Sequence, residues 1–408
     1  MSYRSFAFVL TLQFAALSAF AAGPKSAGPR AVRFASFNIE VLSAEKLRSV
    51  DSQGRGAHPQ LLKAAEILQR IRPDVLLVNE IDYDGPDDDV PASTAGAGSA
   101  ASLNSAVRFR DLYLHVGQNG QEPLNYPNLF YRPSNTGIPT GRDLDNDGTT
   151  DGPADAYGYG KYPGQYGMAL YSRHPIDASA ARTFRKFLWA DMPNNLMPDG
   201  KNGKPEFYSP DEAALFRLSS KSHWDVPVRI GRSTLHVLAS HPTPPIFDGP
   251  EDSNGRRNFD EIRLWSDYIS AGDRAAYIRD DSGKSGGLPA DADFIVMGDL
   301  NADPVRNEQA YGKPAVRQLL DLPNVQDPGP RSEGSPLAAH EIELDDYLPY
   351  RTSKFGRIDY CLPSRGLKLA GSGVFWPKPD DPLYRLVSDP EPASDHYAVW
   401  IDLVLPGT

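Results

Sequence analysis

Residues 294–301 read FIVMGDLN, a continuous apolar run followed by a glycine and then by an acid and an amide one residue apart. An uninterrupted apolar run of this length is typical of a strand that is buried on both faces. Similar boundaries occur earlier in the chain, where residues 34–40 read FASFNIE and residues 75–82 read VLLVNEID. We therefore predict buried strands that end in acids and amides.

Helical patterns alternate with these runs. Residues 58–71 carry apolar side chains at helical spacing and stop at Arg72-Pro73, because proline cannot continue a helix. A second helical pattern covers residues 257–269. Further strands are predicted at residues 32–37, 167–171, 235–240, 357–362 and 397–403. Strands interleaved with helices and long connections indicate an α/β fold with layered sheets.

Three long stretches, residues 84–105, 133–163 and 303–348, are loop-like. Loops of this length are either functional or mobile. None of the three separates two self-contained periodic regions, so we expect one domain, residues 30–408, with long loop insertions.

The composition excludes several classes of protein. The chain has 408 residues, 42 Lys+Arg against 53 Asp+Glu, a formal net charge of −11 and one cysteine, Cys361. A single cysteine excludes a disulfide framework. The acidic balance argues against tight nonspecific binding of nucleic acid, which needs cationic side chains to replace the phosphate counterions. The acidic composition does not exclude a nuclease, because a metal-lined cleft can bind phosphate within an acidic protein.

The N-terminal segment has the pattern of a secretory signal peptide. Arg4 is its only charge, an apolar run follows, and residues 19–21 read AFA, which matches an A-x-A cleavage site. The apolar run is broken by Gln13 and is shorter than the ~20 residues that span a bilayer. We expect residues 1–21 to be removed from a secreted or periplasmic protein that has no transmembrane segment.

A restricted set of polar residues follows the predicted strands. They are acids, amides and histidines: Asn38, Glu40, Asn79, Glu80, His241, Asp299, Asn301, Asp359, Asp395 and His396. In layered α/β folds, ligand sites gather at strand ends. Oxygen ligands of this kind suit a divalent metal ion, and the acids and histidines beside it suit chemistry on an anionic ester.

The order of these motifs resembles the endonuclease/exonuclease/phosphatase superfamily. The resemblance is carried by N-x-E at 38–40, N-E-I at 79–81, YGMALYSR at 166–173, H-P at 241–242, G-D-L-N at 298–301, R-I-D-Y at 357–360 and S-D-H at 394–396. It covers about residues 32–404, and G-D-x-N and S-D-H are its specific parts. The resemblance implies a four-layered α/β sandwich, in which two packed mixed β-sheets are flanked by helices.

The resemblance also implies which residues bind the metal ion. Glu80 matches the principal metal-binding glutamate, and Asn38 lies beside it. Asp395 matches an acid that assists metal binding. Glu40 occupies a position that varies among relatives and is acidic in some of them.

The remaining matches imply catalytic roles. Asp299 matches the aspartate that orients or deprotonates the attacking water, and Asn301 matches the amide that positions it. His396 matches the histidine that hydrogen-bonds the scissile phosphate, and Asp359 matches its orienting carboxylate. His241 stands where nuclease relatives have a histidine or tyrosine that contacts the phosphate.

These roles imply an exported phosphoesterase that uses Mg²⁺ or Mn²⁺ and hydrolyses phosphate esters by in-line attack of an activated water. The substrate is a small molecule, a lipid headgroup or nucleic acid, and the acidic composition favours the first two. Two alternatives stay open. One is a secreted nuclease acting on DNA or RNA, and the other is a non-catalytic, calcium-stabilised binding protein on the same scaffold.

Residues 143–151 read DLDNDGTTD and match the first part of a calcium loop. Asp143, Asp145, Asp147 and Asp151 supply the regularly spaced acids, and Thr149 offers a carbonyl. Ala154 replaces the final glutamate, so the loop is not a complete EF-hand. We predict a structural Ca²⁺ here, because four close acids would otherwise repel one another; a solvated acidic turn is the alternative.

Arg256 and Arg257 open the second helical pattern. Helix N-termini favour anions, and the guanidinium fork binds phosphate well, so both are candidate phosphate-binding residues. Ion pairs with Asp260 and Glu261 are an equally favoured alternative for these side chains.

Overall fold

The computed structural model describes residues 31–90, 104–201, 203–305, 311–338, 346–388 and 390–405. The predicted signal peptide, residues 1–21, lies outside these ranges. Within them, no helix combines the length and the hydropathy that crossing a membrane requires.

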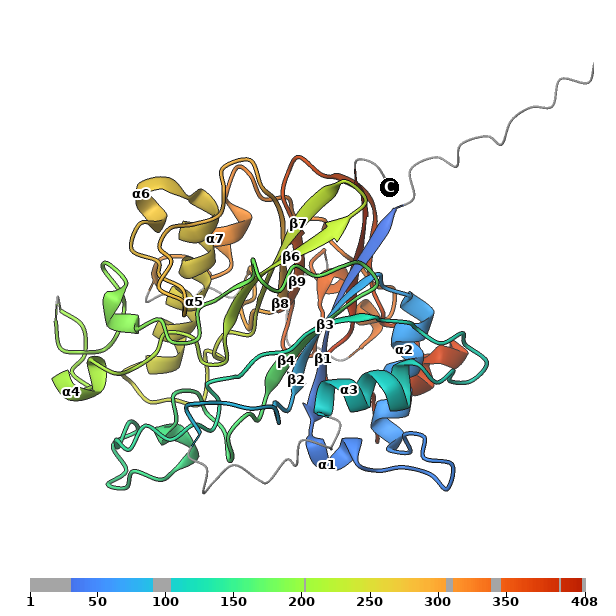
Figure 1. Ribbon diagram of the computed structural model, residues 1–408, viewed down its shortest axis with the longest axis horizontal. Coiled ribbons are helices and arrows are strands. Elements are labelled where there is room, and N and C mark those ends of the chain that lie inside the picture. The colour runs from blue at the N-terminus through green and yellow to red at the C-terminus, as the bar shows by residue number, and fades with distance from the viewer. Residues whose placement is uncertain are drawn as a thin grey trace, which may run out of the picture.

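Two β-sheets form the centre of the described chain (Figure 1). The strands are β1 (Val32–Leu42), β2 (Val75–Ile81), β3 (Asn128–Phe130), β4 (Gly167–Ser172), β5 (Arg182–Thr183), β6 (His223–Ile230), β7 (Ser233–Ser240), β8 (Asp293–Asp299), β9 (Asp359–Pro363), β10 (Lys368–Val374) and β11 (Val399–Val404). The six-stranded sheet has the order β10-β11-β1-β2-β4-β3, and the five-stranded sheet has the order β5-β6-β7-β8-β9.

Both sheets are mixed. β1 and β2 run parallel, as do β7 and β8, whereas the other neighbouring strands run antiparallel. A parallel pair needs a crossover connection, usually a helix. Helix α2 (Pro59–Ile71) makes this connection between β1 and β2, and α5 (Ser253–Ser270) makes it between β7 and β8.

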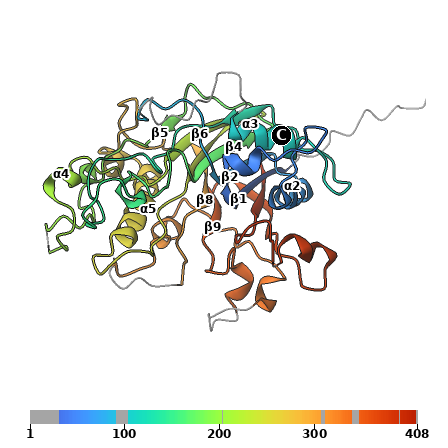
Figure 2. The ribbon, with the colours of Figure 1, turned by 90° about the horizontal axis from the view of Figure 1, so that it is seen from below.

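Helices cover the outer faces of the two sheets. The other helices of the described chain are α1 (Ala44–Leu47), α3 (Ser105–Phe109), α4 (Pro210–Ala213), α6 (Gly272–Ala275) and α7 (Arg317–Leu320). Figures 1 and 2 show α2 and α3 on one side of the sheets and α5 on the other. The predicted α/β sandwich, with two packed mixed sheets between helices, is confirmed.

Alternate residues of the five-stranded sheet face two different apolar cores. Ala239 and Met297 belong to the core that the sheet shares with β1 and β2. Leu238 and Val296 belong to a second core, where they lie with Trp265 of α5. Because side chains of a strand alternate between its faces, β7 and β8 contribute to both cores.

The predicted elements correspond to β1, β2, β4, β7, β8, β9, β11, α2 and α5. The sequence pattern does not predict β3, β5, β6 and β10. β3 and β5 are very short, β6 contains Pro227, and β10 contains two glycines, Gly371 and Gly373. Proline and glycine are both depleted in strands, so these segments lack the usual strand signal.

Candidate active site

The strand-end residues converge at one edge of the space between the two sheets. Ala239 and Met297 face the core between the sheets. His241 and Asp299 follow them by two positions, so their side chains continue on the same face. Asp359 pairs with Asp299 across β8 and β9. At this edge the apolar core therefore gives way to a buried group of polar side chains.

Asp299 lies at the centre of this group and is 1% exposed. Its Oδ2 accepts a hydrogen bond from Nδ2 of Asn38 at 3.0 Å and lies 3.4 Å from Nε2 of His241 and 3.8 Å from Nε2 of His396. Its Oδ1 accepts a hydrogen bond from the backbone N–H of Asn301 at 2.9 Å. Fixed donors therefore hold both carboxylate oxygens in place.

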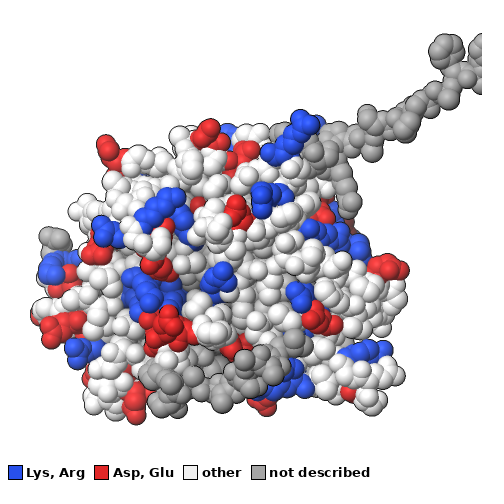
Figure 3. Space-filling model, viewed as in Figure 1, with Lys and Arg blue, Asp and Glu red and all other residues white. Residues whose placement is uncertain are grey.

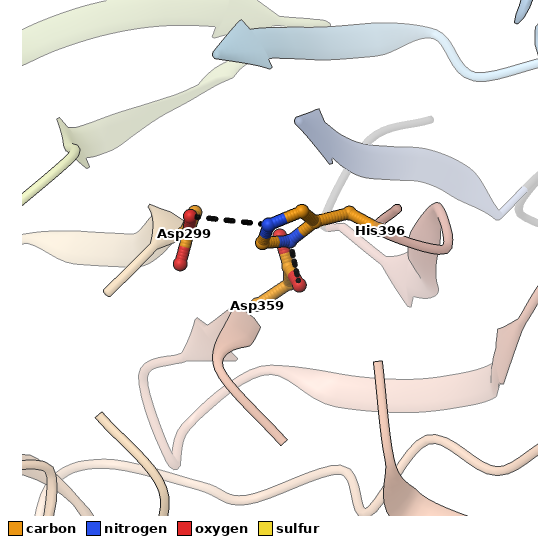
Figure 4. A group of neighbouring side chains, drawn as sticks. All are labelled: Asp299, Asp359 and His396. Atoms are coloured by element: carbon orange, nitrogen blue, oxygen red, sulfur yellow. Dashed lines mark hydrogen bonds and ion pairs between the residues drawn. The ribbon is translucent and has the colours of Figure 1, made fainter. Parts of the chain in front are cut away.

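His396 and Asp359 form a buried pair next to this carboxylate (Figure 4). Nδ1 of His396 lies 2.9 Å from Oδ2 of Asp359, and the Thr352 hydroxyl donates to the same oxygen at 2.7 Å. The Ser394 hydroxyl accepts from the backbone N–H of His396 at 3.1 Å and donates to the carbonyl of Asn38 at 2.8 Å. These contacts fix the orientation of the imidazole. We call Asn38, His241, Asp299, Asp359 and His396 the Asp299 cluster.

Burial and mutual charge set the protonation of the cluster. Burial alone would lower the pKa of His396, but Asp359 and Asp299 outweigh it and raise this pKa well above its usual 6.5. Burial would raise the pKa of Asp299, but His396 and His241 hold it below its usual value. Burial raises the pKa of Asp359 to about 6, against the charge of His396. At neutral pH His396 is therefore a cation between two carboxylates.

Asn38 of the cluster and two residues next to it, Glu80 and Asp395, offer oxygen ligands that fit a divalent metal ion. Oδ1 of Asn38 is buried and has no hydrogen-bond partner among the described residues. Nδ2 of Asn38 donates to Oε1 of Glu80 at 3.2 Å, and the backbone N–H of Val41 donates to Oε2 of Glu80 at 2.9 Å. Burial and the charge of Glu80 raise the pKa of Asp395, and together they outweigh the charge of His396, which lowers it. An oxygen donor set with an unpartnered buried acceptor suits Mg²⁺ or Mn²⁺.

A different grouping fits a metal ion less well. Ligand atoms of Asp299, Asp359 and His396 lie within 4.8 Å of one another. However, a protonated imidazole has no free lone pair to offer, so this trio is an ion-pair network. Glu40 is exposed as a residue, but its carboxylate is partly covered, and this desolvation and the charges of Asp395 and Glu80 raise its pKa. A metal-binding role for Glu40 stays a prediction.

The predicted calcium loop forms an exposed acidic group of its own. Carboxylate oxygens of Asp143, Asp145 and Asp147 lie within 4.8 Å of one another. They accept backbone N–H groups inside the loop, including that of Thr149 at 2.8 Å from Oδ1 of Asp147. Asp151 is exposed. These contacts describe a tight acidic turn, and the calcium site stays a prediction.

The two arginines have other partners. The guanidinium of Arg257 is buried and donates to the backbone carbonyls of Tyr157, Arg217 and Leu218. Nε of Arg256 donates to the carbonyl of Glu251 at 2.9 Å. Within the described ranges, neither side chain hydrogen-bonds to the Asp299 cluster.

Several residues of the site received no role in the sequence-based assignment. Asn79 accepts a hydrogen bond from the backbone N–H of Asp299 at 3.3 Å, and Thr352 and Ser394 orient the His396–Asp359 pair. Asn79 and Ser394 belong to the quoted motifs, so their position was a usable signal. Thr352 lies in a segment without a predicted strand, and no sequence signal indicates it.

Comparison with solved structures finds similar folds. An endonuclease/exonuclease/phosphatase from Beutenbergia cavernae DSM 12333 shares 16% identity, with 92% of this chain and 72% of that chain covered and a TM-score of 0.50. A mannosyl-6-phosphatase from Bacteroides thetaiotaomicron VPI-5482 shares 13% identity, with 92% and 100% covered and a TM-score of 0.43. Sphingomyelinase C from Streptomyces griseocarneus shares 13% identity, with 91% and 99% covered and a TM-score of 0.38. At 16% identity, the likeness to the Beutenbergia cavernae protein concerns the fold alone.

Comparison with curated proteins finds no match. A family model, in contrast, matches residues 35–396, which include every member of the Asp299 cluster and the three candidate metal ligands. The match therefore extends over most of the chain and over the site. The chain belongs to the endonuclease/exonuclease/phosphatase family, whose members are phosphoester hydrolases.

Proposed function

We propose that the chain hydrolyses phosphoesters by direct attack of water on phosphorus, and that it depends on a divalent metal ion. The observation that carries this proposal is the buried Asp299 carboxylate, which stays ionised between Asn38, His241 and His396. An ionised acid held by fixed donors orients a water molecule, and the imidazolium beside it offers positive charge to a phosphate.

Asp299 is proposed to orient the water and to accept its proton. The water oxygen forms a bond to phosphorus while the bond from phosphorus to the leaving oxygen breaks in line with it. A carboxylate with a lowered pKa is a weak base towards free water. The attacking water becomes far more acidic as its oxygen bonds to phosphorus, so the proton moves to Asp299 late in the step. The leaving oxygen takes a proton from solvent.

His396 is proposed to donate its Nε2–H to a non-bridging phosphate oxygen, while Asp359 keeps the ring charged and oriented through Nδ1. Negative charge grows on these oxygens in the transition state, and a fixed cation therefore stabilises it. When held by Asn38, Glu80 and Asp395, a Mg²⁺ or Mn²⁺ ion supplies Lewis-acid neutralisation of the phosphate.

The proposed substrate is a small-molecule or lipid-derived phosphoester. The net charge of the chain is −11, and Figure 3 shows basic and acidic side chains intermixed over the face it draws. Extended nucleic-acid binding favours a continuous cationic track along the backbone. The charge distribution therefore supports the smaller substrates over DNA or RNA.

The test is an activity panel with the protein after EDTA treatment and dialysis. Bis-p-nitrophenyl phosphate, p-nitrophenyl phosphate and plasmid DNA are offered with Mg²⁺, Mn²⁺ or Ca²⁺ in turn. We expect hydrolysis of one or both nitrophenyl esters with Mg²⁺ or Mn²⁺ and none with EDTA. Cleavage of DNA alone would favour the nuclease, and inactivity on all three would favour the non-catalytic binding protein.

We also propose that residues 1–21 direct export and that residues 30–408 form one domain. The signal-peptide pattern supports the first statement, and the core shared by β strands of both sheets supports the second. The chain is expressed with its own N-terminus in a bacterial host, and the exported protein is sequenced from its amino end. We expect it to begin at Ala22, and an intact Met1 on that protein would contradict cleavage.

A further inference from the structure

A buried lysine lies at the same edge of the five-stranded sheet as the Asp299 cluster. Lys221 is only 7% exposed and precedes β6 by two residues. β6 begins at His223, which pairs with Ser240 of β7, and His241 of the cluster follows Ser240 directly. Lys221 therefore lies next to the cluster, on its β6 side.

The ammonium of Lys221 has no bonded partner among the described residues. Its backbone carbonyl accepts from the N–H of Asn135 at 2.9 Å, but no hydrogen bond or ion pair engages Nζ. Glu261 of α5 is the strongest opposite charge acting on it. Both carboxylate oxygens of Glu261 already accept backbone N–H groups, from Ser220 at 2.7 Å and from Thr243 at 2.6 Å.

An unpaired buried ammonium is costly to fold. Removing a charge from water without a bonded counter-charge is strongly unfavourable. Within the described part of the chain, Nζ of Lys221 lacks a hydrogen-bond partner but is not fully covered by the protein. It therefore keeps an opening to solvent. An ion pair within the protein does not explain this arrangement, because no carboxylate of the described residues bonds to the ammonium of Lys221. An anionic ligand that enters from the opening would explain it.

The charge of Lys221 acts on the centre of the site. Burial lowers the pKa of Lys221, opposed by the negative charges of Glu261, Glu80 and Asp299. Burial and Lys221 together lower the pKa of His241. In the strand order β6-β7-β8-β9, Lys221 precedes β6, Asp299 ends β8 and Asp359 begins β9. Lys221 and Asp359, which binds His396, therefore lie on opposite sides of Asp299. A phosphate that reaches Asp299 thus enters between two cations.

We propose that Lys221 binds the phosphate of the substrate and that its ammonium donates hydrogen bonds to a non-bridging oxygen, on the side opposite His396. This inference rests on the proposed function, because that function brings a phosphate to Asp299. A protonated lysine has three donors, and bonds from a charged donor to a phosphate oxygen are short and strong. The bound phosphate supplies the counter-charge that the free protein lacks.

The test measures binding of inorganic phosphate to the Mg²⁺-loaded protein by isothermal titration calorimetry. Lys221→Met is compared with wild type and with Lys368→Met, which removes the same charge from an exposed position on the edge strand β10. We expect Lys221→Met to weaken phosphate binding by about ten- to a hundredfold, the range of a hydrogen bond to a charged group. Lys368→Met should bind as wild type does. Equal binding by Lys221→Met and wild type would overturn the proposal, as would a wild type that binds no phosphate.

A second pair of variants covers a folding defect in Lys221→Met. Lys221→Arg keeps the positive charge and Lys221→Gln removes it, so phosphate should bind at least tenfold more tightly to the arginine variant. Equal binding to both would contradict the inference. Ester hydrolysis by wild type is followed in parallel. A wild type that binds phosphate through Lys221 but hydrolyses no ester would refute the proposed function and leave Lys221 as a phosphate-binding residue without a hydrolytic role.

Discussion

Replacing Asp299 by asparagine tests the centre of the proposed mechanism. The Asp299→Asn side chain keeps the size of the carboxylate and removes its charge and its ability to accept a proton. Asn38 and the backbone N–H of Asn301 donate to the two carboxylate oxygens at 3.0 and 2.9 Å, so the variant turns one of these donors towards an amide NH₂. The change therefore affects both stability and turnover.

The two effects differ in size. Because the folded state lowers the pKa of Asp299, its ionised form contributes stability at neutral pH, which is lost only as the pH falls through that lowered pKa. A hydrogen bond to a charged group contributes about 1.5–3 kcal/mol, against a total folding free energy of about 5–15 kcal/mol. The variant should therefore remain folded. Loss of a general base lowers the rate by about 10²–10⁴, or about 3–5 kcal/mol in activation free energy.

The assay measures kcat for bis-p-nitrophenyl phosphate at saturating Mg²⁺ or Mn²⁺, together with the melting temperature. The matched control is Asp402→Asn. Asp402 accepts hydrogen bonds from the Arg33 guanidinium at 2.7 and 2.8 Å, near the start of β1 and far along that strand from Asn38. We expect the control to melt lower but to keep its kcat. Loss of a general base should lower kcat by at least about 10²-fold. An Asp299→Asn variant that retained more than about a tenth of the wild-type kcat would therefore refute the assignment.

Three further predictions concern other parts of the molecule. Removing the metal ion with EDTA should abolish hydrolysis, and Asn38→Ala should raise the Mg²⁺ concentration needed to restore it by tenfold or more; an unchanged Mg²⁺ requirement would speak against Asn38 as a ligand. Burial lowers the pKa of His223 to about 4, so the free energy of unfolding should fall by about 3 kcal/mol between pH 6.5 and pH 4. In denaturant titrations, His223→Asn should show a smaller fall over this pH range, and an equal fall in the variant and wild type would contradict the argument. Equilibrium dialysis should detect Ca²⁺ bound to wild type at millimolar concentration and less bound to Asp145→Asn, whereas no Ca²⁺ on wild type would remove the predicted calcium loop.

Much of the site follows from the order of residues along the chain. Continuous apolar runs such as residues 75–78 and 294–297 predict buried strands, and the acids and amides that follow them predict a polar edge. The inference works because strand ends meet at the edge of a sheet. The structure indeed brings Asn38, Glu80 and Asp299 into one hydrogen-bonded group.

Other members of the site carry no comparable signal. Lys221 lies in a polar run before a strand that contains proline, and Thr352 lies in a long loop. Arg257 is an opposite case. Its sequence pattern suits phosphate binding, but its guanidinium is buried and donates to three backbone carbonyls. Such roles depend on which distant segments become neighbours, and spacing along the chain does not contain that information.

The sequence by itself determined the layered α/β class, the main strands and helices, and the set of polar residues at the strand ends. These features depend on local periodicity and on hydrophobicity, which neighbouring residues express directly. Only the tertiary structure decided the order of strands in each sheet, the pairing of His396 with Asp359, and the burial of Lys221 without a partner. Protonation and counter-charge arise from side chains that meet across two sheets, so they exist only once both sheets have packed together.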